Sequence, residues 1–119
     1  MPILEIEIVG EAEAREGLAR RLADAAGEAL GARPGGTWVR LRFLPPEQYG
    51  ESGGPVPDDV RPVFVHVMKR SWPEGGPSAE EVARVTEAIA AVVGRDPGLV
   101  HVRHEPPGAG RQAFGGDLV

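Results

Sequence analysis

The chain has 119 residues, 41% of them hydrophobic and 26% charged, with a formal net charge of -5. This length suits one domain with a real core, and the composition is that of an ordinary soluble globular protein. The acidic balance argues against a nucleic-acid partner, and no run of about 18 apolar residues is present to cross a membrane. Cysteine is absent, which excludes disulfides and thiol nucleophiles. The first residues lack the pattern of a secretory signal, so we expect a cytoplasmic protein.

The first elements in chain order are a strand over residues 3–9 and a helix over about 13–30. In the strand, Ile6 and its apolar neighbours alternate with Glu5 and Glu7, the period-two pattern of a half-buried strand. The helical segment has one apolar face and is expected to stop at Gly31. The residues of that face are Leu18, Leu22, Ala25, Ala26 and Ala29.

A short block then occurs twice in the sequence. Val-Arg-Leu-Arg at 39–42 is followed by two prolines at 45–46, and Val-His-Val-Arg at 100–103 is followed by two prolines at 106–107. Each block continues to an aromatic residue followed by glycine, Tyr49 in the first case and Phe114 in the second. A strand and a helix precede each block, so the chain predicts strand, helix, strand and Gly-rich tail, twice.

The second repeat begins with a strand over 63–68 and continues with a helix that opens at Ser78. Ser78 and Glu81 have the spacing of a capping box, and Gly94 and Pro97 follow the last apolar residues of the helix. A segment rich in glycine and proline, 50–57, separates the repeats.

These elements predict an α+β fold in a single domain, 1–119, with repeats over about 2–54 and 61–116. A strand-helix-strand crossover of this length joins parallel strands, so two units give a four-stranded sheet with both helices on one face. The other face carries charged residues among larger apolar ones, which is typical of a solvated face or a subunit interface.

The order of these features resembles the tautomerase superfamily, which includes 4-oxalocrotonate tautomerase and macrophage migration inhibitory factor (MIF). The features are Pro2 directly after Met1, alternating apolar residues, an amphipathic helix, Val-Arg, and an aromatic-Gly element near Gly-Gly. Occurring twice, they resemble the fused members, which have two β-α-β units in each chain. The resemblance implies a homotrimer without a cofactor.

In that family the amino-terminal proline, freed by removal of Met, is the catalytic acid or base, and the resemblance assigns this role to Pro2. Desolvation and nearby cations disfavour the ammonium form of such an amine, which lowers its pKa toward neutrality. Pro62 lies within a peptide bond and offers no second base. While Met1 remains attached, the Pro2 nitrogen is an amide without basicity.

The resemblance also implies a binding site for a small carboxylate substrate. Arginines in such a pocket bind a carboxylate and stabilise a developing enolate. The resemblance gives this role to Arg40 and Arg70 with Arg103 as a helper, and makes Tyr49 and Phe114 the pocket walls. Other readings remain open: Arg40 and Arg42 also fit cross-strand ion pairs with the glutamates of residues 3–9, and both aromatics fit interface packing.

Two functional hypotheses follow. The first is a tautomerase or isomerase that moves a proton between keto and enol forms of a small 2-oxo or 2-hydroxydienoate acid. The alternative is a non-catalytic trimeric scaffold or ligand-binding protein with a blocked N-terminus. The loop after the first strand lacks the arginine that single-repeat members carry there, which favours the alternative. His101 and His104 should lie on opposite faces of a strand, so we expect no metal site.

Overall fold

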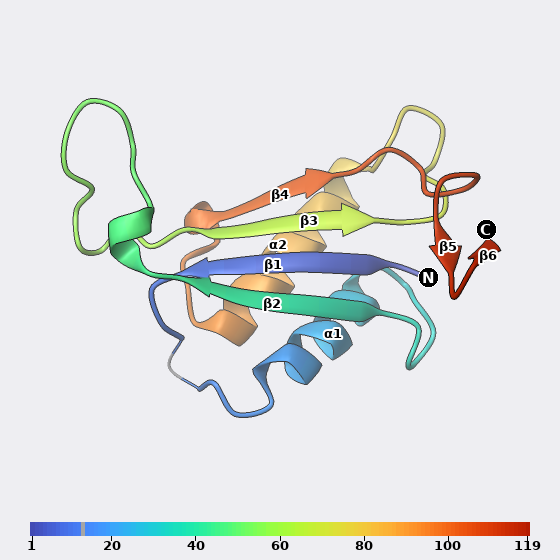
Figure 1. Cartoon of the computed structure of the whole chain (residues 1–119), viewed down its shortest axis with the longest axis horizontal. Coiled ribbons are helices and arrows are strands. Elements are labelled where there is room, and N and C mark those ends of the chain that lie inside the picture. Colours follow the sequence, from blue (N-terminus) through green and yellow to red (C-terminus); the bar gives the residue numbers. More distant parts are fainter. Residues whose placement is uncertain (13) are drawn as a thin grey trace.

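The computed structural model describes residues 1–12 and 14–119 (Figure 1). Two longer helices, two short 3-10 helices and six strands follow one another along the chain. The first repeat contains β1 (Ile3–Val9), α1 (Leu18–Ala29), β2 (Trp38–Leu44) and η1 (Pro46–Gln48). The second contains β3 (Val63–Met68), α2 (Ala79–Val93), η2 (Pro97–Leu99), β4 (Val100–His104), β5 (Ala113–Phe114) and β6 (Asp117–Leu118).

The four long strands form one mixed sheet in the order β2-β1-β3-β4. Each crossover joins a parallel pair, β1 with β2 and β3 with β4, while β1 and β3 meet as antiparallel neighbours in the centre. The antiparallel centre relates the two β-α-β units by an approximate twofold rotation. The predicted α+β fold with two β-α-β repeats is thus confirmed.

Both helices lie side by side across one face of the sheet (Figure 1), as the sequence predicted. They cover a core of buried aliphatic side chains from the central strands and from one stripe of each helix. Its fully buried members include Leu4, Ile6, Ile8, Leu22, Val63, Val65, Val67, Val85 and Ile89. The apolar faces of both helices are therefore buried within a single chain.

The first helix is shorter than the sequence pattern predicts, because it begins at Leu18 rather than near residue 13. Gly17 precedes it in the left-handed conformation, with φ of 63°, and such a residue interrupts a right-handed helix. The predicted start at Glu13 lies outside the described residues. Gly27, inside the helix, passes so close to Thr37 that an added Cβ would lie 2.8 Å from Thr37 Oγ1.

The second helix begins as predicted, but only half of the expected capping box forms. The Ser78 hydroxyl oxygen accepts a hydrogen bond from the Glu81 backbone N–H at 3.1 Å. The Glu81 carboxylate does not return to Ser78; it binds the Lys69 ammonium, with Oε1 at 3.0 Å from Nζ. A residue that sequence reasoning assigned to helix capping therefore contributes to a tertiary ion pair.

The outer face of the sheet, opposite the helices, has polar side chains arranged in rows across the strands. One row runs through Arg40, Glu5, His66 and Arg103, which are register neighbours on four adjacent strands. In the described part of the chain no helix covers this face (Figure 1). The prediction of a mixed outer face is confirmed.

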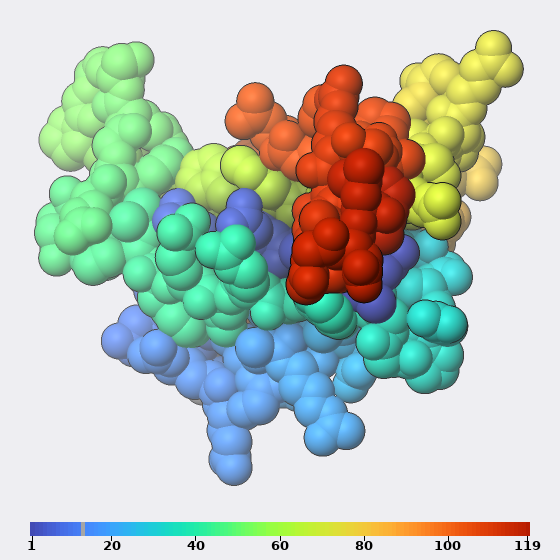
Figure 2. Space-filling model, turned by 45° about the vertical axis from the view of Figure 1, so that its right-hand side comes forward, coloured from blue at the N-terminus to red at the C-terminus, as the bar shows by residue number. Residues whose placement is uncertain are grey.

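The two Gly-rich tails end differently. The first forms η1 and a projecting loop at one end of the sheet, and the second forms the β5–β6 hairpin beside the N-terminus at the other end (Figure 1). Figure 2 shows this C-terminal segment as a ridge above the neighbouring surface. Among the described residues, neither helix is long and apolar enough to cross a bilayer.

The core gives a first testable expectation. Ile6 lies at the centre of the sheet with 1% of its surface exposed, so Ile6→Ala removes buried methyl groups and should lower the free energy of unfolding by about 2–5 kcal/mol. Leu118→Ala is the control, because Leu118 is 68% exposed and its truncation should change stability by no more than about 0.5 kcal/mol. Denaturant titrations at one fixed protein concentration measure both, and equal effects would contradict the assigned core.

Candidate functional site

Pro2 is buried at the start of β1, where the sheet register fixes its neighbours. Its carbonyl oxygen accepts a hydrogen bond from the Trp38 N–H at 3.1 Å, which continues the pairing with β2. On the other side, Ile3 is paired with Met68 in an antiparallel register, so the next positions outward bring Pro2 beside Lys69. Two residues 67 positions apart in the sequence therefore meet at one end of the sheet.

A hollow of about 450 Å³ opens at this point. Its lining comes from the chain start, the segment after α1 and the end of β3: Met1, Pro2, Leu30, Gly31, Ala32, Arg33, Gly36 and Lys69. Two of these residues, Arg33 and Lys69, carry positive charge. The hollow therefore combines the N-terminal proline with two cations that can attract a carboxylate.

Neither Arg33 nor Lys69 is among the site residues predicted from the sequence. Lys69 did carry a signal, because it is the sole lysine of the chain and directly follows the strand at 63–68. Arg33 carried none, since it lies in a segment without periodicity, between Gly31 and Gly35. Their convergence on Pro2 depends on the antiparallel pairing of β1 and β3 and on where α1 ends.

Met1 bears on the chemistry of this hollow, because its peptide bond makes the Pro2 nitrogen an amide. Met1 also lines the hollow, and 44% of its surface is exposed. Its removal would leave a secondary amine at the same place, beside Lys69.

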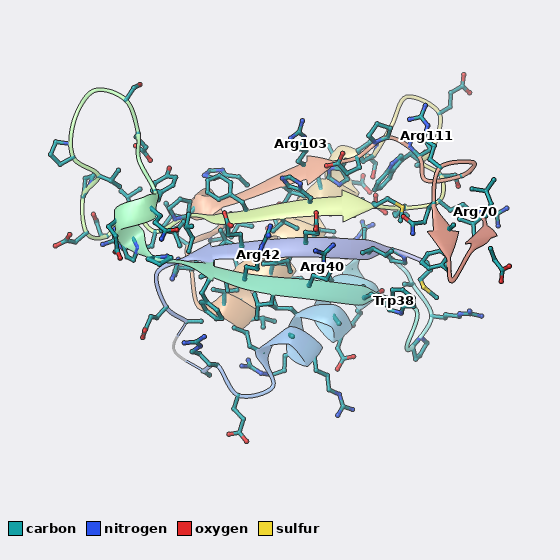
Figure 3. The ribbon with its side chains drawn as sticks, viewed as in Figure 1. Trp38, Arg40, Arg42, Arg70, Arg103 and Arg111 are labelled. Carbon is teal, nitrogen blue, oxygen red and sulfur yellow. The ribbon has the colours of Figure 1, made fainter. Side chains whose placement is uncertain are left out.

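The predicted arginines lie elsewhere in the described structure. Arg40 and Arg103 project from the outer face of the sheet, and Arg70 follows β3 near the C-terminal hairpin (Figure 3). Arg40 forms the cross-strand ion pair that was the alternative reading, with Nη1 at 2.8 Å from Glu5 Oε1. Arg42 faces Glu7 in the register, but no ion pair within 4.0 Å links it to any described residue.

A second hollow, of about 370 Å³, lies on that outer face. It is lined by Ile3, Glu5, Trp38, Arg40, His66, Met68, Glu105 and Gln112. His66 Nδ1 and Glu105 Oε1 are 3.4 Å apart within it. With both acidic and basic groups already paired, this surface offers less free positive charge to an anionic ligand than the Pro2 hollow does.

The two predicted wall aromatics lie at opposite ends of the molecule. Phe114 packs edge-on against Trp38, with ring centroids 5.2 Å apart, at the same end of the sheet as Pro2. Tyr49 lies 5.9 Å from Phe64 and donates a hydrogen bond to Glu51 at 2.6 Å. The hydrogen bond to Glu51 raises the pKa of Tyr49. Within one chain, Tyr49 does not reach the Pro2 hollow.

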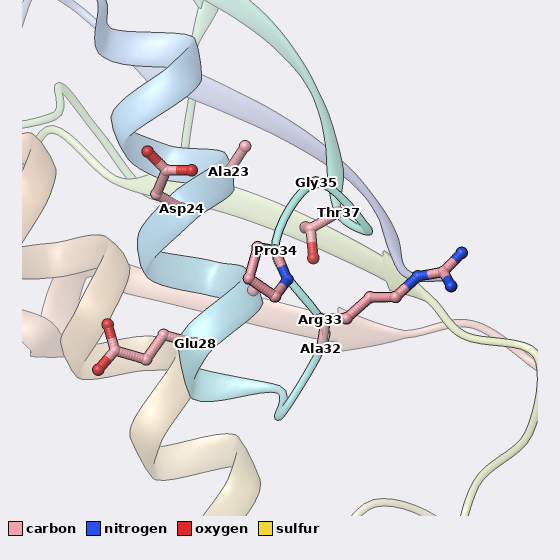
Figure 4. Close-up of a pocket in the computed structure, with 9 residues that line it drawn as sticks. Ala23, Asp24, Glu28, Ala32, Arg33, Pro34, Gly35 and Thr37 are labelled. Atoms are coloured by element: carbon pink, nitrogen blue, oxygen red, sulfur yellow. The ribbon is translucent and has the colours of Figure 1, made fainter.

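A third hollow, of about 320 Å³, lies between α1 and the segment that follows it (Figure 4). Asp24 and Glu28 project at its rim, and the Arg33 side chain points away from both (Figure 4). Two exposed carboxylates do not suit an anionic substrate. Across residues 1–12 and 14–119, no group of three or more His, Cys, Asp or Glu side chains could hold a metal ion.

Comparisons with known proteins place this geometry in context. No family model and no curated protein sequence matches the chain. Solved structures do match, among them two that each cover 98% of this chain and 94% of their own. One is Pt0534 inactivated by 2-oxo-3-pentynoate, at 20% identity and a TM-score of 0.71. The other is an asymmetric trimer of wild-type fused 4-OT, at 21% identity and a TM-score of 0.68.

A MIF-like protein from Entamoeba histolytica also matches, at 13% identity and a TM-score of 0.64, over 95% of this chain and 94% of that one. The chain has the tautomerase-superfamily fold in its fused, two-repeat form. This confirms the resemblance that the sequence carried, at the level of the fold. In this tautomerase fold the Pro2 hollow forms at the end of the sheet where β1 begins and β3 ends.

Behind the hollow lies a partly buried group of polar and aromatic side chains from the second repeat. Trp72 packs edge-on against His104, with ring centroids 5.0 Å apart, and donates its indole N–H to the Glu105 carbonyl at 2.9 Å. Burial lowers the pKa of His104, and the Lys69 charge adds to this effect while the Glu81 charge opposes it. As predicted, His101 and His104 lie on opposite faces of β4.

The lowered pKa of His104 predicts a specific pH dependence of stability. The unfolded chain binds a proton on His104 below about pH 6.5, where the folded chain resists protonation. The contribution of His104 to the free energy of unfolding is therefore fully present above that pH. It is lost as the pH falls toward the lower pKa of the folded state. Urea unfolding between pH 5 and 8 should show a smaller acid loss for His104→Gln than for the wild type. An equal loss in both would contradict the assignment.

Proposed function

We propose that the chain is a cofactor-independent tautomerase that transfers a proton between keto and enol forms of a small 2-oxo or 2-hydroxydienoate acid. The observation that carries the proposal is the burial of Pro2 in a hollow that it shares with Lys69 and Arg33. The fused tautomerase fold supports it, because it makes the N-terminal strand a central strand of the sheet.

In the proposed mechanism the residues have separate roles. Once Met1 is removed, the Pro2 secondary amine takes a proton from one carbon or oxygen of the substrate and returns it to another. Burial and the positive charges of Lys69 and Arg33 disfavour its ammonium form, so its pKa lies below that of an ordinary α-amino group. The same cations bind the carboxylate and stabilise the enolate that forms during transfer.

A homotrimer is part of the proposal. Three matched fused 4-OT structures are trimers, and the outer sheet face of this chain is a surface of mixed charge that no described helix covers. Tyr49 lies at the sheet end opposite Pro2, so it could wall a Pro2 hollow only from a neighbouring copy. Arg40, Arg70, Arg103 and Phe114 remain proposed as contributors to substrate binding in such an assembly.

The alternative, a trimeric scaffold or ligand-binding protein with a blocked N-terminus, is favoured by one observation. None of the five predicted substrate-binding residues lines the Pro2 hollow of the described chain. The two functions differ in the state of a single atom, the Pro2 nitrogen, which can be examined directly.

The covalent test uses the compound that inactivates Pt0534. We expect 2-oxo-3-pentynoate to add once to the processed chain, because a secondary amine adds across an activated triple bond without a leaving group. Peptide mass spectrometry should place the adduct on Pro2, and the labelled protein should no longer ketonise enolic phenylpyruvate.

The matched control is a chain that keeps one residue ahead of Pro2, which should form no adduct on the proline and show no rate above buffer. If the processed wild type also gives no rate above buffer, the tautomerase proposal fails. A mass of the protein from its native host that retains Met1 would then support the scaffold.

The proposed assembly has its own test. Sedimentation equilibrium should give a mass equal to three chains of 12.6 kDa each. A mass equal to one chain across the micromolar range would contradict the trimer, and would also remove the only route by which Tyr49 could reach a Pro2 hollow.

A further inference from the structure

Lys69 lines the Pro2 hollow, and its ammonium is held on two sides. Glu81 Oε1 lies 3.0 Å from Nζ, and the Trp72 ring centroid lies 5.0 Å from it. Lys69 is largely buried, with 23% of its side chain exposed. An ammonium has three donors, and only one of them is used by a hydrogen bond to a described residue.

Glu81 is unusual among the charged residues of the described chain. It is buried, with 9% of its surface exposed, and is the single charged residue in that class. Its second oxygen, Oε2, is also buried and has no hydrogen-bond partner among the described residues. Burial of a carboxylate is costly unless it is paired, and Lys69 provides that pair.

Glu81 forms its ion pair with Lys69 in place of the helix-capping interaction that its position in α2 would allow. At the third position of a helix that opens at Ser78, a glutamate ordinarily reaches back to the N-cap backbone. Here the carboxylate points to Lys69 at the end of β3 instead. The side chain of α2 thus links the helix to the residue that lies beside Pro2.

Trp72, the other support of Lys69, is itself fixed by the second repeat. Its indole N–H binds the Glu105 carbonyl, and its ring meets His104 at the end of β4. The ring face attracts the ammonium through a cation–π interaction. The cation of the hollow is therefore positioned by groups from α2, the β3–α2 loop and the end of β4, while Pro2 comes from the first repeat.

From this geometry we propose that Glu81 is a positioning residue that holds Lys69 as the carboxylate anchor of the Pro2 hollow. The inference rests on the proposed function for its substrate class, a small 2-oxo acid. The first repeat supplies the base, and the second supplies a cation held in place before the ligand arrives. Holding the cation in advance lowers the entropy lost when the acid binds.

The direction in which one substitution changes the affinity for an anionic ligand distinguishes a positioning role of Glu81 from a purely electrostatic one. Glu81→Gln removes a negative charge close to the hollow, which by charge alone would strengthen the binding of an anion. If Glu81 positions Lys69, the substitution instead frees the ammonium and weakens binding. We expect binding about tenfold weaker, the size of effect typical of losing one charge-assisted hydrogen bond.

The test uses the fact that Lys69 is the sole lysine. Incorporation of lysine labelled with carbon-13 at Cε gives one NMR signal, and 2-oxobutanoate is titrated into the processed protein. In the wild type the two Hε protons of a held side chain should be inequivalent, and the signal should shift on addition of the acid. In Glu81→Gln the two protons should become equivalent, and the midpoint of the titration should rise about tenfold.

Glu80→Gln is the matched control, because Glu80 lies in the same first turn of α2 but is exposed. It should leave the Lys69 signal and the titration midpoint unchanged. Glu81→Asp keeps the charge but shortens the side chain, so it tests only whether the carboxylate must reach the Lys69 ammonium. This variant also replaces Glu81→Gln if the latter does not fold. Positioning predicts weaker binding for Asp as well, with a raised KM and a smaller change in kcat in the ketonisation assay.

Unchanged or tighter binding in Glu81→Gln, or in Glu81→Asp where only that variant folds, would overturn the inference. So would a wild-type Lys69 signal that 2-oxobutanoate does not move. The inference would also be overturned if Glu81→Gln lowered thermal stability but left the midpoint of the 2-oxobutanoate titration unchanged, because Glu81 would then form only a structural ion pair. If 2-oxobutanoate binds as expected but the processed protein fails to ketonise, the proposed function fails while the role of Glu81 stands.

Discussion

The antiparallel pairing of β1 with β3 is the constraint on which the rest of the structure depends. It joins two β-α-β units into one sheet and places Leu4, Ile6 and Ile8 against the valines of β3 in a fully buried layer. A slip of one residue would turn those side chains to the outer face, so burial of the core fixes the register. The same register sets Pro2 beside Lys69, and hydrophobic packing thereby determines which charge the proline faces.

The sheet separates two kinds of charge. On the outer face, some acidic and basic side chains pair with one another, as Arg40 does with Glu5 and Glu105 does with His66. The Arg40 side chain is 72% exposed and that of Glu5 is 43% exposed, so the ion pair adds little to stability. At the end of the sheet beside the helices, Lys69 and Arg33 share a hollow with Pro2, and the acid that pairs with Lys69 is buried behind it. In this second arrangement Lys69 keeps two of its three donors free of hydrogen bonds to described residues, beside Pro2.

The two repeats have diverged in the parts that surround this hollow. Their strands and helices correspond, but Pro2 of the first repeat directly follows Met1, whereas Pro62 of the second repeat lies in the middle of the chain. The second repeat provides Lys69, Trp72 and Glu81 at the same end of the sheet. Its tail ends in a hairpin that packs Phe114 against Trp38 there, whereas the first tail carries Tyr49 to the far end.

The sequence by itself determined the fold, because periodicity, capping and breaker residues act locally and the repeated block showed that the unit occurs twice. Through the family resemblance it also singled out Pro2, whose nitrogen becomes a secondary amine once Met1 is removed. It could not select Arg33, Lys69 and Glu81, which converge through strand register and the end point of α1. It placed Arg40 on the face opposite the helices but left open whether that side chain pairs with a glutamate of the first strand or binds substrate, and the structure shows the pair with Glu5. Glu81 illustrates the difference: its spacing from Ser78 indicates a cap, while tertiary packing turns its carboxylate to a lysine twelve residues earlier.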